Sequence, residues 1–243
     1  MTVSAQEIKN LPPSAGKIIA ITGCDGSGKS TLANSLVNYL SAYNPTELIY
    51  LGQSSGAIGR WLGQLPLVGG PVGRFLLSRA QRVSEHPSRL PGNLTALVIF
   101  LLSCWRGYKF RKMLKKARQG RLLITDRYPQ AEVAGFRVDG AQLAKTSGGN
   151  RWLGWLRRRE QRLYQWMASY PPRLLIRLNV DEQTACTRKP DHPAVALREK
   201  IALIPSLTFN GATIIDLDGT APAAEICQAS LRAILQRLTP PDM

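Results

Sequence analysis

The chain has 243 residues, of which 44% are hydrophobic and 20% are charged, so it is long enough for a substantial core and too apolar to be disordered. Lysine and arginine number 32 against 16 aspartate and glutamate residues, and the formal net charge of +16 favours polyanionic partners such as nucleotides, nucleic acid or an acidic membrane surface. The longest nearly unbroken apolar stretch, residues 94–105, is too short to cross a bilayer. Four scattered cysteines without a CxxC pair, and no basic-then-apolar leader pattern in residues 1–16, predict a cytoplasmic protein without a disulfide framework or zinc knuckle.

Short apolar runs alternate with stretches of helical periodicity from residue 17 onward. Strands are expected at residues 17–22, 47–51, 121–126, 173–178 and 212–216. Helices are expected at residues 29–40, 94–118, 157–169, 194–207 and 223–238, with a short one after Asp181 and a loop at 137–151. This alternation predicts an α/β fold with a parallel sheet covered on both faces.

One domain is expected over residues 17–243, preceded by a flexible N-terminal tail at residues 1–16. Residues 52–92 are rich in glycine and proline and have weak periodicity, so they are expected to form a long insertion with one helix near residues 75–83.

Residues 23–30, Gly-Cys-Asp-Gly-Ser-Gly-Lys-Ser, match the phosphate-loop pattern G-x-x-x-x-G-K-[ST] between a predicted strand and a predicted helix. Small residues let successive backbone N–H groups turn toward a phosphate, and the helix N-terminus adds positive potential. In this pattern Lys29 bridges the β- and γ-phosphates and the Ser30 hydroxyl binds Mg²⁺. The residues predicted to hold ATP are Gly23, Asp25, Gly26, Ser27, Gly28, Lys29, Ser30 and Thr31.

Two further patterns resemble motifs of other nucleotide-binding classes. Lys189-Pro-Asp191 resembles the guanine motif of GTPases, but Arg188 precedes it and no D-x-x-G switch lies between it and the phosphate loop. The sequence at residues 147–150, Ser-Gly-Gly-Asn, resembles an ABC-ATPase signature, but its distance from Val180-Asp-Glu182 is too long. Both are therefore interpreted as a loop and a helix cap.

The strand at residues 121–126 runs into Thr125-Asp126-Arg127-Tyr128. Together with the acidic residue at the third position of the phosphate loop, this motif resembles the thymidylate kinase-like branch of the P-loop nucleoside monophosphate kinases. The resemblance in element order spans residues 17–238. It implies a five-stranded parallel sheet of order 2-3-1-4-5, ATP and Mg²⁺ as cofactors, and transfer of the γ-phosphoryl group to a small acceptor.

The same resemblance assigns roles to individual residues. Asp126 corresponds to the carboxylate that organises Mg²⁺, and Arg127 to the arginine that pairs with the acceptor's phosphate. Asp25 corresponds to the acidic residue that holds an acceptor sugar hydroxyl. Arg106 falls within one residue of the family's acceptor-binding helix arginine.

A short lid is expected at about residues 187–200 from the same resemblance. One subgroup of these kinases has a catalytic arginine in the phosphate loop, where this chain has Gly26. The lid is then expected to supply the catalytic cation through Arg188 and Arg198, because phosphoryl transfer builds charge on oxygens. Lys189 and Lys200 are secondary candidates.

The acceptor is left open by the sequence. After Asp126 the chain lacks the serine and the tyrosine-glutamine pair that accompany this motif in thymidylate kinases. The expected acceptor is therefore a nucleotide or a related small phosphorylated molecule, with a nucleoside kinase as an alternative.

A basic segment containing Trp152 and Trp155 suggests a function of another class. The arginines around this pair are Arg151, Arg157, Arg158, Arg159 and Arg162. We interpret the pair as core-facing, with solvated arginines. The alternative is an NTP-binding regulator or adaptor that docks on an anionic membrane or on nucleic acid. A homodimer is also compatible with the sequence, whereas His86 and His192 are too few to indicate a metal site.

Overall fold

The computed structural model describes residues 17–52, 92–145 and 148–238. The predicted N-terminal tail and nearly all of the predicted insertion lie outside the described residues. In chain order the elements are β1 (Ile18–Gly23), α2 (Lys29–Ser41), β2 (Thr46–Tyr50), α5 (Asn93–Arg118), β3 (Leu122–Asp126), η1 (Phe136–Val138), η2 (Leu143–Lys145), α6 (Arg151–Ala168), β4 (Leu174–Asn179), α7 (Glu182–Arg188), α8 (Ala194–Leu203), η3 (Ile204–Ser206), β5 (Ile214–Asp218) and α9 (Ala223–Leu238).

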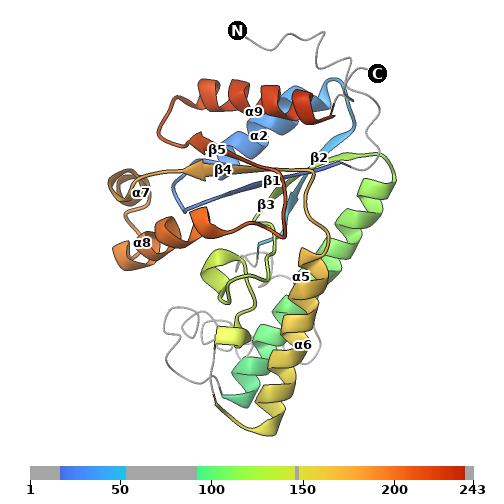
Figure 1. Cartoon of the computed structure of the whole chain (residues 1–243), viewed down its shortest axis with the longest axis vertical. Coiled ribbons are helices and arrows are strands. Elements are labelled where there is room, and N and C mark those ends of the chain that lie inside the picture. The colour runs from blue at the N-terminus through green and yellow to red at the C-terminus, as the bar shows by residue number, and fades with distance from the viewer. Residues whose placement is uncertain (1–16, 53–91, 146–147, 239–243) are drawn as a thin grey trace, which may run out of the picture. The chain divides into compact units, whose positions relative to one another are not determined.

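The five strands form one parallel sheet in the order β2-β3-β1-β4-β5, which confirms the predicted α/β fold and strand order. β1, β3 and β4 are almost entirely buried because each has a neighbour on both sides. β2 and β5 are half-buried, as expected for edge strands that alternate between core and solvent. Figure 1 shows the sheet with α2 and α9 on one face and α8 on the other.

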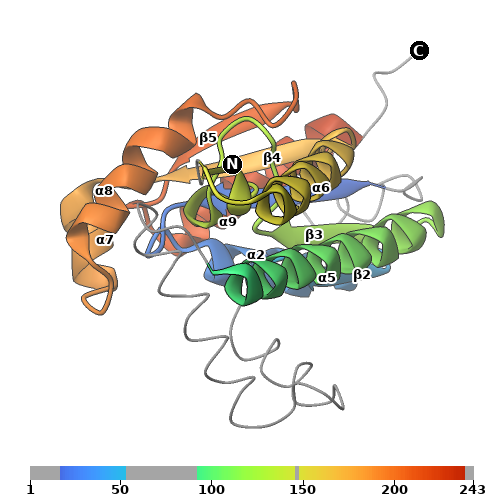
Figure 2. The same cartoon turned by 90° about the horizontal axis from the view of Figure 1, so that it is seen from below.

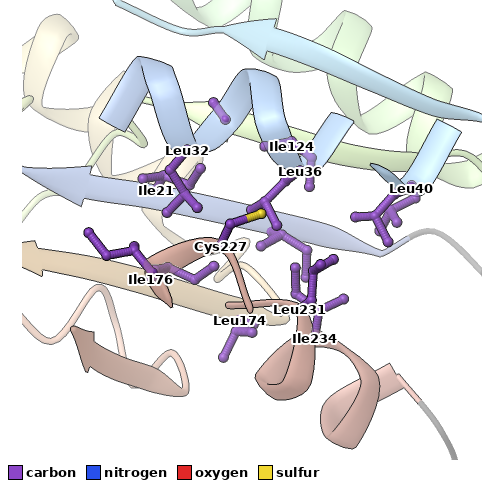
Figure 3. Close-up of a cluster of buried hydrophobic side chains, with 14 of the residues drawn as sticks. Ile21, Leu32, Leu36, Leu40, Ile124, Leu174, Ile176, Cys227, Leu231 and Ile234 are labelled. Carbon is purple, nitrogen blue, oxygen red and sulfur yellow. The ribbon is translucent and has the colours of Figure 1, made fainter. Parts of the chain in front are cut away.

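A continuous apolar core fills the space between the sheet, α2 and α9 (Figure 3). Leu32, Leu36 and Leu40 recur at helical spacing on α2 and are all buried against the strands. From α9, Cys227, Leu231 and Ile234 enter the same core. This packing fixes the start of α2, and with it the loop that precedes the helix.

Two compact units divide the described residues. The first contains residues 17–51, 111–128 and 171–238, and so holds the whole sheet. The second contains residue 52 and residues 92–110, 129–145 and 148–170, that is, the N-terminal part of α5 together with α6. The single domain expected from the sequence stays a prediction.

In the second unit, α5 and α6 lie side by side (Figures 1 and 2). Ser103 on α5 donates a 2.6 Å hydrogen bond to the buried Glu160 carboxylate on α6. The rings of Phe110 and Trp166 meet edge to face. Across the described ranges, no helix combines the length and apolarity that crossing a membrane requires.

α6 begins earlier than the sequence periodicity predicts. The helix begins at Arg151 rather than at residue 157, because the Asn150 side chain accepts a hydrogen bond from the Leu153 N–H and caps the helix there. Gly154 is accommodated inside the helix.

Candidate functional site

The loop at residues 23–28 links β1 to α2 and owes its shape to three glycines. Gly23, Gly26 and Gly28 have φ angles of 152°, 87° and 91°, a region that side chains rarely adopt. A Cβ on Gly23 would lie 2.5 Å from Ser27 Oγ and 2.6 Å from the Leu178 carbonyl oxygen. The loop therefore curls tightly at the carboxyl end of β1, and the N-terminal N–H groups of α2 face the same side, as anion binding requires.

Lys29, the first residue of α2, lies over this loop. Its side chain is buried, with 8% of the residue exposed, and its Nζ donates a 2.6 Å hydrogen bond to the Cys24 carbonyl oxygen. Burial lowers the pKa of Lys29, and the nearby Arg127 guanidinium lowers it further. The ammonium group is thus held at the centre of the loop by a backbone acceptor.

Asp126 and Arg127 enter the site from the end of β3. β3 pairs with β1, with Asp126 opposite Ile21 in the register, so its carboxylate lies next to the phosphate loop. Arg127 has a φ of 62°, a left-handed conformation that non-glycine residues adopt mainly at turns and functional sites. Its Nη2 donates a 2.8 Å hydrogen bond to Oδ1 of Asp25.

Asp25 is the most strongly paired carboxylate of the site. Arg127 binds one of its oxygens, and Lys200 of α8 donates a hydrogen bond to the other. Burial alone would raise the pKa of Asp25, but Lys200 and Arg127 together hold it well below its usual value. The carboxylate is therefore ionised and joins the phosphate loop, β3 and α8.

Arg188, at the end of α7, connects two further parts of the site. Its Nη1 donates hydrogen bonds to the carbonyl oxygens of Gly26, at 3.2 Å, and Gly219, at 2.8 Å. Gly219 follows β5, so this one guanidinium ties the phosphate loop to the carboxyl end of the edge strand.

A cavity of about 630 Å³ opens between these groups, all within the first unit. Its wall includes the carboxyl ends of several strands, where open α/β sheets bind ligands. The residues that line it are Asp25, Gly26, Ser27, Gly28, Lys29, Ser30, Thr31, Leu32, Ser35, Tyr50, Asp126, Arg127, Leu178, Arg188, Lys189, His192, Gly219, Ala221, Ala223 and Ile226.

The structure brings most of the sequence-predicted site residues together around this cavity, and Gly23 starts the loop that borders it. Two lie elsewhere. Arg198 forms a bidentate ion pair with Glu182, and its side chain is 66% exposed. Arg106 is buried within the second unit, where it donates hydrogen bonds to Asp139 and to the Tyr164 hydroxyl.

Sequence reasoning missed Tyr50 and Ser35 and made no use of His192. Tyr50 is the last residue of β2, and the rule that carboxyl ends of parallel strands share one edge could have identified it. The positions of Ser35 and His192 carry no such signal.

The strand order, together with a glycine-rich loop between β1 and α2, defines a P-loop NTPase fold. No protein-family model matches the chain. It is 70% identical over 218 residues to a protein of Escherichia coli K12 named uncharacterized ATP-binding protein YghS, with 90% of this chain and 92% of the relative covered. A second protein of that strain, named uncharacterized ATP-binding protein YghR, is 38% identical over 217 residues, covering 89% and 86% respectively. The chain belongs to the family that contains YghS and YghR.

Proposed function

We propose that the chain binds ATP in the cavity of the first unit and transfers its γ-phosphoryl group to a nucleotide or a related small phosphorylated acceptor. The observation that carries the proposal is the position of Lys29, whose ammonium lies over a glycine loop at the N-terminus of α2. Two relatives that are named as ATP-binding proteins support the choice of ATP.

Nucleotide binding follows from groups that already point into the cavity. The loop amides and the first turn of α2 bind the phosphate oxygens, and Lys29 exchanges its bond to the Cys24 carbonyl for the β- and γ-phosphates. Arg188 and Gly219 line the cavity beside the phosphate loop, because Arg188 also donates a hydrogen bond to the Gly26 carbonyl oxygen. Ala221 and Ile226 give the cavity wall an apolar surface for the base.

The residues present also fit a Mg²⁺ ion. Such ions usually bind one or two carboxylates together with water and phosphate oxygens. Asp126 is buried at the cavity wall that also contains Ser30, whereas Asp25 is already paired with two cations. We therefore assign the ion to Asp126 and Ser30; when bound, it would offset the charge on the β- and γ-phosphate oxygens. The described residues contain no cluster of three or more His, Cys, Asp or Glu that could hold a metal without phosphate.

The transfer itself requires stabilisation of negative charge rather than covalent help from the protein. An acceptor oxygen forms a bond to the γ-phosphorus while the bond to the bridging oxygen breaks, and ADP leaves with that electron pair. Arg127, Arg188 and Lys189 line the cavity and provide cations for the oxygens that gain charge. Because so many of these groups are cationic, a phosphorylated acceptor is favoured over a nucleoside.

Asp25 has a positioning role in this proposal. It orients Arg127 and Lys200 through direct hydrogen bonds, so its carboxylate keeps both cations beside the phosphate loop. The thymidylate kinase-like assignment rests on Asp25 and on Asp126-Arg127, and it stays a proposal. So do the roles of Arg198 and Arg106 in catalysis and acceptor binding.

The experiment is a coupled ADP-release assay with Mg–ATP and a panel of nucleoside monophosphates, nucleosides and sugar phosphates. We expect turnover with at least one phosphorylated acceptor and at least a hundredfold loss in Lys29→Ala, by order of magnitude. Lys115→Ala removes the same charge from an exposed position of α5 and should keep full activity. No ADP release with any acceptor of the panel, or equal activity of Lys29→Ala and Lys115→Ala, would overturn the proposal.

A further inference from the structure

Two tryptophans of the second unit are exposed, contrary to the core-facing position expected from the sequence. Trp152 and Trp155 on α6 are 44% and 41% exposed. Their rings stack on one another with a centroid separation of 5.4 Å and an interplanar angle of 13°. The core of the unit is filled instead by a different stripe of α6, which includes Leu153, Leu156, Tyr164 and Met167.

Arginines surround the pair. The Arg159 guanidinium lies over the Trp155 ring, 5.3 Å from its centroid. Glu160, the only acidic residue in the α6 sequence, is buried against Ser103, so all the charged side chains on the exposed part of the helix are cationic. We define the α6 surface as Arg151, Trp152, Trp155, Arg158, Arg159 and Arg162, all of them exposed.

The neighbouring helix α5 also has exposed apolar side chains. Phe100 meets the Trp155 ring at a centroid distance of 6.2 Å, so the two helices are in contact there. Leu94 and Leu101 are 54% and 37% exposed, and their spacing of seven residues places them on one side of α5. Indole rings, aliphatic side chains and arginines thus occur together on one helix pair.

We propose that the α6 surface docks this protein on an anionic phospholipid bilayer. Tryptophan settles at the boundary between headgroups and acyl chains, while the arginines bind lipid phosphates. A lipid surface fits better than nucleic acid, because Trp152 and the Arg159 guanidinium already stack on the Trp155 ring, where a nucleobase would have to stack. Exposed leucines gain free energy from lipid but have no stacking role on a base.

The test is co-sedimentation of the full-length protein with phosphatidylcholine vesicles that do or do not contain phosphatidylglycerol. We expect binding only to the anionic vesicles, and weaker binding as salt is raised. Arg158→Glu with Arg162→Glu should reduce the partition coefficient at least about tenfold. Trp152→Ser with Trp155→Ser should reduce it by a similar factor and remove any blue shift of tryptophan fluorescence.

A matched control distinguishes binding through the α6 surface from attraction by the net positive charge of the whole protein. Arg232→Glu with Arg237→Glu makes the same charge change on exposed positions of α9 and should bind vesicles like the wild type. Lys29→Ala should also bind normally, since docking does not depend on the nucleotide site. Equal loss in the α9 control, unchanged binding of the tryptophan variant, or binding to single-stranded oligonucleotides without vesicle binding would each overturn the proposal.

Discussion

Lys200 on α8 donates a hydrogen bond to the carboxylate of Asp25 in the phosphate loop, although the two residues are 175 positions apart in the chain. Both side chains are only 11% exposed, so the pair is shielded from solvent. Since Arg127 binds the other oxygen of Asp25, this one carboxylate links the phosphate loop and the end of β3 to α8, most of which lies within the predicted lid at residues 187–200. A movement of α8 would therefore displace Lys200 and change the pairing of the Asp25 carboxylate in the phosphate loop.

We expect Lys200→Met to lower the free energy of unfolding by about 3 kcal/mol, because the buried Asp25 carboxylate loses one of its two cations. Lys200→Arg should recover part of the loss. Chemical denaturation measures both. Arg198 lies on α8 like Lys200, but its ion pair with Glu182 of α7 is exposed, so Arg198→Met should leave the free energy of unfolding almost unchanged. If Lys200→Met and Arg198→Met lowered the free energy of unfolding equally, the buried pair would contribute no more stability than the exposed one, which would contradict the prediction.

Gly23→Ala should prevent nucleotide binding, because its Cβ would collide with Ser27 and with the backbone of β4. The matched substitution Gly154→Ala lies inside α6, where the new Cβ would meet only an arginine side chain at 3.6 Å. We expect Gly154→Ala to raise the free energy of unfolding by about 0.5–1 kcal/mol without changing nucleotide affinity. Normal nucleotide binding by Gly23→Ala would contradict the loop geometry described above.

Arg177 is predicted to be a structural anchor of the sheet. It binds Asp216 on β5 through two hydrogen bonds and also donates to the carbonyl oxygens of Ile204, Pro205 and Leu207. Arg177→Met should therefore lower the free energy of unfolding, measured by urea denaturation, by about 2–4 kcal/mol. A loss below about 0.5 kcal/mol would mean that water replaces these hydrogen bonds, and it would contradict the structural role assigned to Arg177.

Glu160 should make the stability of the second unit depend on pH. Burial raises its pKa to about 7, although hydrogen bonds from Ser103 and Leu143 oppose the shift. The folded state thus keeps a proton that the unfolded chain releases near 4.5, so stability is greatest below that value. About 3 kcal/mol should be lost as the pH rises from there through about 7.

Glu160→Gln is the control for this pH effect. Its amide can accept the bond from the Leu143 N–H and donate to Ser103, yet it does not titrate. We expect a flat stability profile between about pH 5 and pH 8 in this variant. A wild-type profile that is equally flat would contradict the assigned pKa.

The phosphate loop and Asp126-Arg127 could be found from the sequence because each is a local pattern next to a recognisable strand. The strand order followed from the resemblance to thymidylate kinase-like proteins and is confirmed. The pairing of Asp25 with Lys200 had no sequence signal, since it depends on how α8 packs after a turn at residues 189–193. For the same reason Arg188 could not be distinguished from Arg198, although only the former is seen at the cavity.

Periodicity also could not decide which side of α6 is buried. Trp152 and Trp155 are large and apolar, so they were expected to face the core. The side of α6 that is buried instead contains Leu153, Leu156 and Glu160. The Glu160 carboxylate can be buried because its two oxygens accept hydrogen bonds from Ser103 and from the Leu143 N–H. A buried, hydrogen-bonded glutamate cannot be recognised from a helical pattern alone.

The catalytic proposal depends on binding of the ATP triphosphate by the loop around Lys29. Isothermal titration with Mg–ATP, performed on the purified full-length protein and on the Lys29→Ala and Lys115→Ala variants, measures this binding. We predict saturable binding near one site per chain for the wild type and Lys115→Ala, and a loss of at least about tenfold in affinity for Lys29→Ala. Folded wild-type protein that shows no heat of binding and no thermal stabilisation by Mg–ATP would contradict the claim.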